Sequence, residues 1–196
     1  MKEMTVNGYI MVGGRSSRMG TDKGLLKVKG KYLVEYVIRH LEPCVAKLFL
    51  VGNDPAYDAI GPERIPDLVR GIGPAGGIIT ALSHSAVSQN FILSCDTPFI
   101  DSDLIFAILK KSEGYEICIP ELKGRMEPLV GYYSKDILPR WTKGMQTGSY
   151  KLQTLIERCH YKTLDVEKDL LSDEKMFMNI NTPDDLIRAE KEGRWV

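Results

Sequence analysis

Short apolar runs separated by stretches with helical spacing are the feature that most constrains how this chain folds. The runs at 8–12, 47–51 and 91–95 lack polar alternation, and each stops at Gly, Asn or Asp residues. Such runs are typical of strands covered on both faces, as in parallel sheets. Between the first two runs, the apolar residues of 33–41 recur at the i, i+3, i+4 spacing of a helix. This order predicts right-handed strand–helix–strand units.

The rest of the chain extends this reading. Further helices are expected at 76–85, 103–110 and 151–158, and strands at 116–119 and 129–133. Near the C-terminus, Thr182 has the residue type of an N-cap, and the proline after it suits the first position of a final helix. The expected fold class is α/β, a three-layer α/β/α sandwich with a mostly parallel, Rossmann-like sheet.

Charge balance excludes several classes of function. The chain has 196 residues, with 26 Lys plus Arg against 26 Asp plus Glu. This gives no basic excess for a general nucleic-acid-binding module. Hydrophobic residues make up 43% of the chain, which argues against disorder. No apolar run approaches the roughly 18 residues needed to span a bilayer, and the N-terminal residues lack the apolar core of a signal peptide.

The four cysteines form no C-x-x-C pair, and no histidine lies near enough in sequence to suggest a zinc site. Free thiols of this kind are typical of a reducing cytoplasm, so a cytoplasmic location is expected. The histidines share no motif, and surface or packing roles are expected for all three: His40, His84 and His160.

A glycine-rich loop follows the first apolar run. Gly13-Gly14 allows the backbone to approach a ligand closely, and three cations follow: Arg15, Arg18 and Lys23. Together they suit a polyphosphate, because arginine forks onto two oxygens and lysine acts as a point charge. The alternative is a surface turn whose charges face water.

Two familiar phosphate loops do not fit this segment. A P-loop needs Gly-Lys-Ser/Thr, whereas Gly20 is followed by Thr21-Asp22. A dinucleotide fingerprint needs an acidic residue at the end of the second strand, about 20 residues on. Glu35 has nearly that spacing but falls inside a predicted helix, so a standard NAD site is disfavoured.

Polar residues at other strand ends are further candidates, because ligands of open α/β sheets lie beyond the carboxyl ends of the strands. Asp96 directly follows the third run, where a carboxylate suits Mg²⁺ or simply forms a turn. Asp67 precedes the glycine-rich stretch 71–77, and a structural cap is its plainer reading. Asn179 and Asn181 either bind substrate or close the turn before the last helix.

These motifs together resemble a known family. The segment 11–23, M-V-G-G…R-M-G-T-D-K, resembles the L-A-G-G…R-M-G-x-D-K signature of the molybdenum cofactor guanylyltransferases, the MobA family. Residues 73–78, 95–99 and 179–186 resemble its G-P-L-x-G-[IL], C-D-x-P-[FY] and N-x-N-T-P-x-[DE]-L elements. The four elements occur in order over nearly the whole chain, so the combined resemblance is strong.

The resemblance implies a fold of the nucleotide-diphospho-sugar transferase type in one domain over 1–196, with a nucleotide-binding half at 1–100 and an acceptor-substrate half at 101–196. It implies that GTP and molybdopterin are the substrates, that molybdopterin guanine dinucleotide and pyrophosphate are the products, and that Mg²⁺ is required. Partners would include proteins that deliver molybdopterin or molybdoenzymes that accept the product, and neither nucleic acid nor a membrane.

The resemblance also implies roles for individual residues. Lys23, Arg18 and Asp96 would act in catalysis, with Asp96 as the metal ligand. Asn179 and Asn181 would lie towards the pterin. The nucleotide would be bound by the following residues: Met11, Val12, Gly13, Gly14, Lys23, Asn53, Asp67 and Asp96.

Two departures from the family pattern bear on the base. Met11-Val12 replaces the usual Leu-Ala, which adds bulk at Val12 where the base should approach, and Ala75 replaces a leucine. Gly13-Gly14 favours guanine, because the related cytidylyltransferases prefer A-A-G. The alternatives are a cytidylyltransferase of the same cofactor, a sugar-phosphate nucleotidyltransferase, a non-catalytic nucleotide-binding carrier or regulator, and a purely structural α/β domain.

Overall fold

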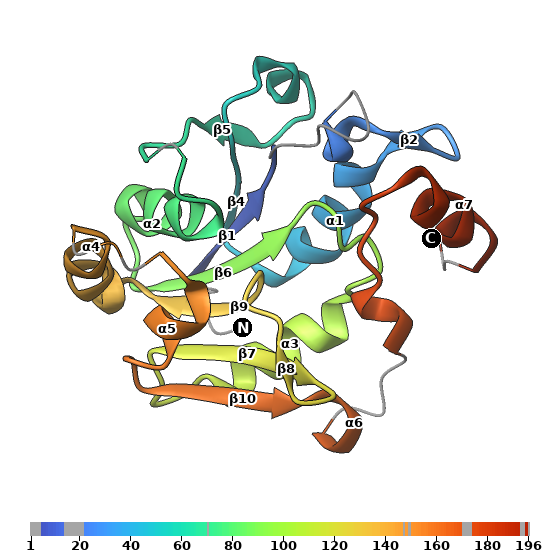
Figure 1. The fold of residues 1–196 in the computed structure, drawn as a ribbon. Coiled ribbons are helices and arrows are strands. Elements are labelled where there is room, and N and C mark those ends of the chain that lie inside the picture. Colours follow the sequence, from blue (N-terminus) through green and yellow to red (C-terminus); the bar gives the residue numbers. More distant parts are fainter. Residues whose placement is uncertain are drawn as a thin grey trace.

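The predicted alternation of strands and helices is present in the computed structural model, which describes residues 5–13, 22–69, 71–146, 148, 150–169, 174–192 and 195 (Figure 1). The strands are β1 (Val6–Met11), β2 (Lys27–Val28), β3 (Lys31–Tyr32), β4 (Lys47–Val51), β5 (Glu63–Ile65), β6 (Gln89–Ser94), β7 (Ile117–Leu122), β8 (Arg125–Met126), β9 (Val130–Ser134) and β10 (Tyr161–Asp165). The helices are α1 (Leu33–Leu41), α2 (Pro74–His84), α3 (Ser102–Lys111), α4 (Leu138–Gln146), α5 (Leu152–Ile156), α6 (Val166–Asp169) and α7 (Pro183–Glu192).

The main sheet is mostly parallel, as predicted. Its strand order is β10-β7-β9-β6-β1-β4-β5, with β8 paired to β7. The central strand β1 is parallel to both neighbours, and its last residue Met11 lies opposite Val51 of β4 and Ser94 of β6. On the main path, β9 alone runs antiparallel to its neighbours. The carboxyl ends of β1, β4 and β6 therefore lie side by side.

Helices cover both faces of this sheet, which confirms the three-layer prediction (Figure 1). One apolar core joins α1 and α3 to the sheet, and a second core joins α2, α4 and α5 to the opposite face. The adjacent residues Tyr9 and Ile10 are both fully buried but belong to different cores. Burial on both faces explains why the strands are continuous apolar runs rather than alternating ones.

A third, smaller core fastens the C-terminal segment to the start of α1. It contains Val28, Leu33 and Tyr36 from the first part of the chain and Ile180 and Ala189 from the last part. This packing places the chain just before α7 close to the turn that precedes β2, although the two are far apart in sequence (Figure 1).

The predicted start of the last helix is correct. Pro183 is the first residue of α7, and Thr182 Oγ1 accepts a hydrogen bond from the backbone N–H of Asp185 at 3.1 Å. The Asp185 carboxylate accepts in return from the Thr182 N–H at 2.9 Å and from the Asn181 N–H at 3.1 Å. Thr182 and Asp185 thus cap the helix reciprocally and fix the backbone of Asn181.

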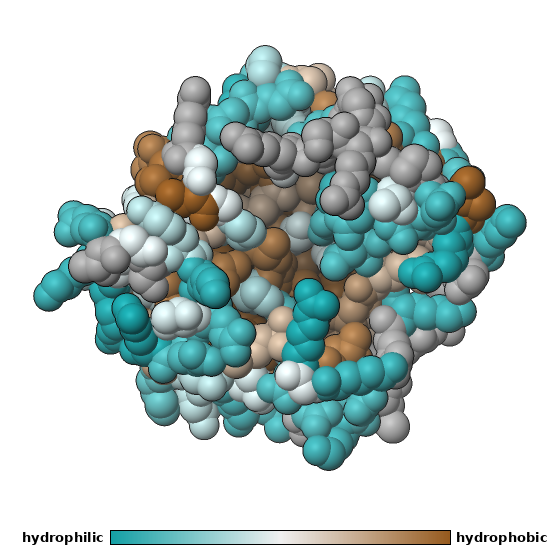
Figure 2. Space-filling model, in the orientation of Figure 1, coloured by the Kyte–Doolittle hydropathy of each residue, from teal (hydrophilic) through white to brown (hydrophobic). Residues whose placement is uncertain are grey.

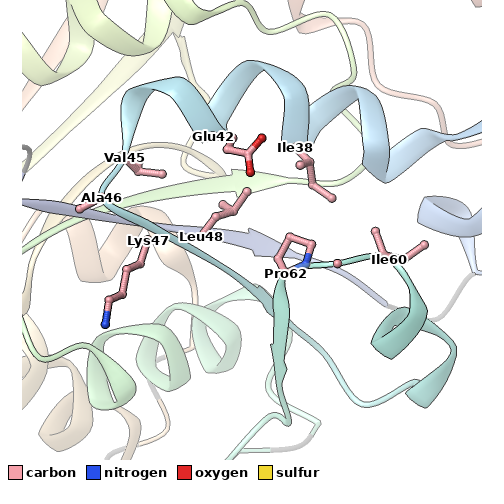
Figure 3. Close-up of a pocket in the computed structure, with 9 residues that line it drawn as sticks. Ile38, Glu42, Val45, Ala46, Lys47, Leu48, Ile60 and Pro62 are labelled. Carbon is pink, nitrogen blue, oxygen red and sulfur yellow. The ribbon is translucent and has the colours of Figure 1, made fainter.

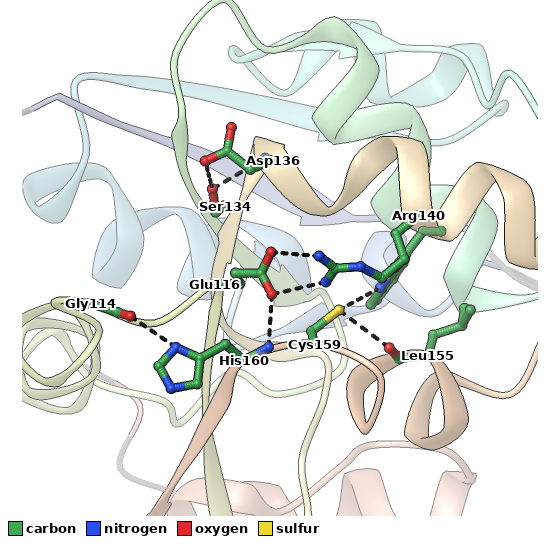
Figure 4. Close-up of polar contacts among 9 residues, drawn as sticks. Gly114, Glu116, Ser134, Asp136, Arg140, Leu155, Cys159 and His160 are labelled. Carbon is green, nitrogen blue, oxygen red and sulfur yellow. Dashed lines mark hydrogen bonds and ion pairs between the residues drawn. The ribbon is translucent and has the colours of Figure 1, made fainter.

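A polar cluster holds the other end of the sheet, next to the start of β7 (Figure 4). Glu116 accepts two hydrogen bonds from the Arg140 guanidinium, at 2.9 and 3.2 Å, and one from the backbone N–H of His160 at 2.7 Å. The guanidinium holds the pKa of the Glu116 carboxyl below its usual range. His160 Nδ1 lies 3.1 Å from the carbonyl oxygen of Gly114, so this histidine has the structural role expected of it.

The four cysteines are free thiols, as predicted, and three of them are buried: Cys44, Cys95 and Cys118. Within the described ranges, no helix combines the length and the apolar character needed to cross a membrane.

Candidate functional site

Three side chains from distant parts of the chain meet beyond the carboxyl ends of β1 and β6. Lys23, in the 3₁₀ turn Lys23–Leu25, donates a hydrogen bond from Nζ to Oδ1 of Asn181. The same Nζ lies 3.6 Å from Oδ2 of Asp96, just after β6. The side chains of Lys23 and Asp96 are only 24% and 21% exposed. The structure therefore brings together three of the residues predicted from sequence, in a partly desolvated ion pair.

Local hydrogen bonds orient the Asp96 carboxylate. Ser94 Oγ donates to its Oδ1 at 2.6 Å, and the Asp96 carbonyl oxygen accepts from the backbone N–H of Ile180 at 3.0 Å. The second contact ties the end of β6 to the segment that carries Asn181. One carboxyl oxygen is thus held by a hydroxyl, and the other faces the lysine.

This donor set fits Mg²⁺ better than a metal held wholly by protein. Among the residues that the structure describes, no three His, Cys, Asp or Glu side chains gather closely enough to hold a metal ion. Mg²⁺ commonly takes one or two protein carboxylates and completes its shell with substrate phosphates and water. A single oriented carboxylate at Asp96 is consistent with that pattern.

A second group of predicted residues lies beyond the ends of β4 and β5. Asn53 Oδ1 accepts from the backbone N–H of Asp67 at 3.2 Å, and Asn53 Nδ2 lies 3.5 Å from Oδ2 of Asp67. At Gly77 in α2, a Cβ would lie only 2.8 Å from Met11 Sδ and 3.8 Å from Asp67 Oδ1. Met11, Asn53 and Asp67 therefore share one neighbourhood, which the glycine leaves room for.

Residues 11–13 lie between the two groups. Val12 N–H donates to the carbonyl oxygen of Val51 at 2.9 Å, and Met11 O accepts from the Cys95 N–H at 3.1 Å, so β1 is held on both sides to its end. Gly13 then has φ +86°, in the left-handed region that favours glycine, and the chain turns there.

The side chain of Val12 does not lie on the Asp67 side of the sheet, where the base is expected. It is 5% exposed and belongs to the core beneath α1. Side chains alternate between the two faces along a strand, so Val12 points to the face covered by α1, whereas Met11 points to the opposite face, where Asp67 lies. The substitution of valine for the family's alanine therefore adds bulk to the core.

Other predicted residues are not placed in the site. Gly14 and Arg18, with the neighbouring Arg15, lie outside the described residues. Asn179 is described, and its exposed side chain lies two positions before Asn181 in the same segment. Roles for these residues stay predictions.

Substitution of Gly52, which directly follows β4, tests how closely the ends of β1 and β4 are packed. A Cβ at Gly52 would lie 2.4 Å from the carbonyl oxygen of Val12 and 2.8 Å from its Cγ2. We expect Gly52→Ala to lower the free energy of unfolding by about 1–3 kcal/mol, because backbone at the end of β1 must move. In the control Gly144→Ala, the nearest atom is a side-chain methyl, Leu155 Cδ2 at 3.1 Å, rather than backbone, so no comparable loss is expected. Urea denaturation of both variants measures the difference, and equal stabilities would contradict this packing.

Glu127 is a charged residue near the site to which the sequence analysis gave no role. It lies three positions before β9, whose first residue Val130 pairs with Leu93 near the end of β6. Burial raises the pKa of the Glu127 carboxyl, Arg125 at 3.9 Å opposes this, and the charge of Asp96 adds to it. In the sequence, the signal that could have identified Glu127 is its position just before a short apolar strand.

The molecular surface is hollowed where these strands end. Figure 2 shows a hollow over β6, with a mainly hydrophobic floor and a hydrophilic rim. A separate pocket of about 350 Å³ lies between α1, β4 and the segment 60–62 (Figure 3). Apolar side chains such as Ile38, Leu48 and Ile60 line it together with Glu42 and Lys47. It contains none of the predicted site residues.

Comparison with known proteins places this geometry in context. A sequence profile described as the MobA-like NTP transferase domain matches residues 8–164. A probable molybdenum cofactor guanylyltransferase of Flavobacterium johnsoniae is 36% identical over 183 residues, covering 93% of this chain and 95% of that protein. The molybdenum cofactor guanylyltransferase of Vibrio vulnificus is 30% identical, with coverage of 91% and 92%.

Solved structures agree with these sequence matches. The crystal structure of molybdopterin-guanine dinucleotide biosynthesis protein A from Archaeoglobus fulgidus has a TM-score of 0.80 and 29% identity, covering 94% of this chain and 97% of that one. A CMP-2-keto-3-deoxy-manno-octonic acid synthetase complexed with CTP has a TM-score of 0.73 at 14% identity over 95% and 97% of the two chains, which shows a shared fold.

Proposed function

This chain belongs to the family of MobA-like NTP transferase domains, and we propose that it transfers GMP from GTP to molybdopterin, forming molybdopterin guanine dinucleotide and pyrophosphate. The observation that carries the proposal is the convergence of Lys23, Asp96 and Asn181 beyond the sheet edge that also presents Met11 and Asp67. The guanylyltransferase names of the relatives supply the identity of the two substrates.

The bond changes are those of an in-line phosphoryl substitution. An oxygen of the acceptor's terminal phosphate attacks the α-phosphorus of GTP, the bond from that phosphorus to the bridging oxygen breaks, and pyrophosphate leaves. The attacking phosphate is already anionic, so no strong base is needed. Catalysis of such a step is mostly positioning and charge neutralisation.

The residues divide this work by position. Lys23 neutralises triphosphate charge at a point where Asn181 already holds its Nζ. Met11, Asn53 and Asp67 lie on the side proposed for the guanine and ribose. Asn179 and Asn181 come from the acceptor half, so the pterin would approach from the α7 side. Asp96 would hold Mg²⁺, which when bound supplies charge neutralisation for the triphosphate and for leaving pyrophosphate.

Nucleotide competition tests this proposal. Purified protein is incubated with molybdopterin, Mg²⁺ and either GTP or CTP, and pyrophosphate release is followed. We expect release with GTP to exceed release with CTP by at least about tenfold, because a pocket that hydrogen-bonds one base leaves polar groups unpaired with the other. Exclusive use of CTP would overturn the guanine assignment. GTP binding without pyrophosphate release would favour the non-catalytic carrier.

A further inference from the structure

We propose that Tyr57 is a positioning residue of the nucleotide site, which fixes Asp22 and thereby the turn that presents Lys23 to the triphosphate. Tyr57 lies in the 3₁₀ turn Pro55–Ala59 after β4, in neither of the two groups of predicted site residues. The inference rests on the proposed function, since it concerns how the same site binds GTP.

The hydrogen bonds form a short chain that ends at the lysine turn. Tyr57 Oη donates to Oδ1 of Asp22, and the same carboxyl oxygen accepts from the backbone N–H of Gly24 at 3.1 Å. Asp22 is therefore the N-cap of the turn that begins at Lys23. The Asp22 side chain, just before Lys23, thus holds the backbone just after it, and the Tyr57 hydroxyl holds the Asp22 carboxylate.

Close packing reinforces these bonds. A Cβ at Gly24 would lie 2.3 Å from Tyr57 Oη, so the phenol lies directly against the backbone that follows Lys23. On the other side, Oδ2 of Asp22 is 3.5 Å from where a Cβ of Gly13 would be. The Asp22 carboxylate is thus seated between the end of β1 and the lysine turn.

The hydroxyl of Tyr57 is buried and forms a hydrogen bond with Asp22. Tyr57 is fully buried and belongs to the core beneath α1, where a phenylalanine ring would fill the same apolar space. Burial raises the pKa of the Tyr57 phenol, and the hydrogen bond to Asp22 raises it further, so the group stays a donor. A buried hydroxyl is costly unless it is hydrogen-bonded, and here its partner is the cap of the Lys23 turn.

Preorganisation is the expected benefit. A lysine side chain loses considerable rotamer freedom when it is fixed on a phosphate, and an anchored backbone limits the further ordering needed on binding. Tyr57 also lies four residues after Asn53 in the segment that follows β4. The segment after β4 therefore contains both Tyr57, which contacts the turn proposed to bind the triphosphate, and Asn53, which lies where the base and ribose are proposed to bind.

A double-mutant cycle tests this inference. Isothermal titration of GTP with Mg²⁺ compares wild type, Tyr57→Phe, Lys23→Met and the double variant. We expect Tyr57→Phe to weaken GTP binding about tenfold in the wild-type background, the size of losing one charge-assisted hydrogen bond. In the Lys23→Met background the same change should have less than a twofold effect, because Tyr57 acts through Lys23.

Tyr9→Phe is the matched control. Tyr9 is also fully buried, and its hydroxyl pairs with His84 Nδ1 at 3.1 Å, away from the strand ends. We expect it to leave GTP affinity unchanged in either background. Asp22→Ala removes the same link from its other end together with the cap on the Gly24 N–H, so it should weaken GTP binding at least as much as Tyr57→Phe. This variant keeps the test valid if Tyr57→Phe unfolds.

The outcomes separate this inference from the proposed function. Equal losses from Tyr57→Phe in both backgrounds would mean that the phenol supports the fold in general, and would overturn the positioning role. Unchanged affinity in Tyr57→Phe or in Asp22→Ala would overturn it as well. If wild type itself binds no GTP, the proposed function fails, whatever the variants do.

Discussion

Asp96→Asn is expected to lower turnover with GTP by about 10²–10³-fold, the effect typical of losing a key electrostatic group. The amide keeps the shape of the side chain and can still accept from Ser94 Oγ, which now donates to Oδ1 at 2.6 Å. It lacks the negative charge that suits Mg²⁺. The loss should therefore appear in catalysis while the fold is retained.

Binding measurements give this prediction a readout apart from activity. With Mg²⁺ present, Asp96→Asn should weaken GTP binding. With Mg²⁺ chelated, it should bind GTP as well as wild type or better, because a carboxylate that repels phosphate has been removed. Asp101→Asn is the control from the same loop: Asp101 caps α3 by accepting from the Leu104 N–H at 2.9 Å, and Asn also caps well. Near-wild-type turnover of Asp96→Asn at limiting Mg²⁺ would exclude the metal role.

Much of the fold of residues 1–100 could be predicted from sequence, because its signals are local. The strands at 47–51 and 91–95 are continuous apolar runs, and in a parallel sheet their polar ends meet at one edge. This reasoning found Asn53 and Asp96 without any knowledge of tertiary contacts. Thr182 likewise caps α7 through residues adjacent in sequence.

What sequence reasoning missed depends on long-range packing. Lys23 and Asn181 are 158 positions apart, and their contact follows from the small core that seats Ile180 against the start of α1. The sequence around Tyr57 gives no sign of its role, which depends on the hydrogen bond that its hydroxyl donates to Asp22, 35 positions earlier. Val12 shows the converse, since its position in a motif suggested ligand contact and its burial assigns it to the core.

The elements missed in the second half have a similar cause. The helix α4 contains a proline and a glycine, residues that weaken a helical pattern. The edge strand β10 has only one buried residue in its five, so it lacks the apolar run that marked the inner strands. Contacts distant in sequence link both elements, since Glu116 accepts from Arg140 of α4 and from the backbone N–H of His160 just before β10.

Lys23→Met should weaken GTP binding by about 10–100-fold, because a hydrogen bond between charged groups contributes about 1.5–3 kcal/mol. Methionine keeps the length and apolar stem of lysine without its charge. The effect should exceed that of an ordinary surface charge, since Lys23 is only 24% exposed and its ammonium group is poorly screened by solvent. Titration of GTP with Mg²⁺ measures the loss directly.

Lys47→Met provides the matched comparison for Lys23→Met. Lys47 is exposed at the amino end of β4, at the opposite edge of the sheet from the site, so its loss should change GTP affinity by less than about twofold. Lys23→Met also removes the cation 3.6 Å from Asp96, which should make the carboxylate bind Mg²⁺ more readily in the absence of nucleotide. Weaker GTP binding together with tighter Mg²⁺ binding is the pattern expected if Lys23 serves the phosphates and Asp96 the metal. Unchanged GTP affinity would exclude the phosphate role of Lys23.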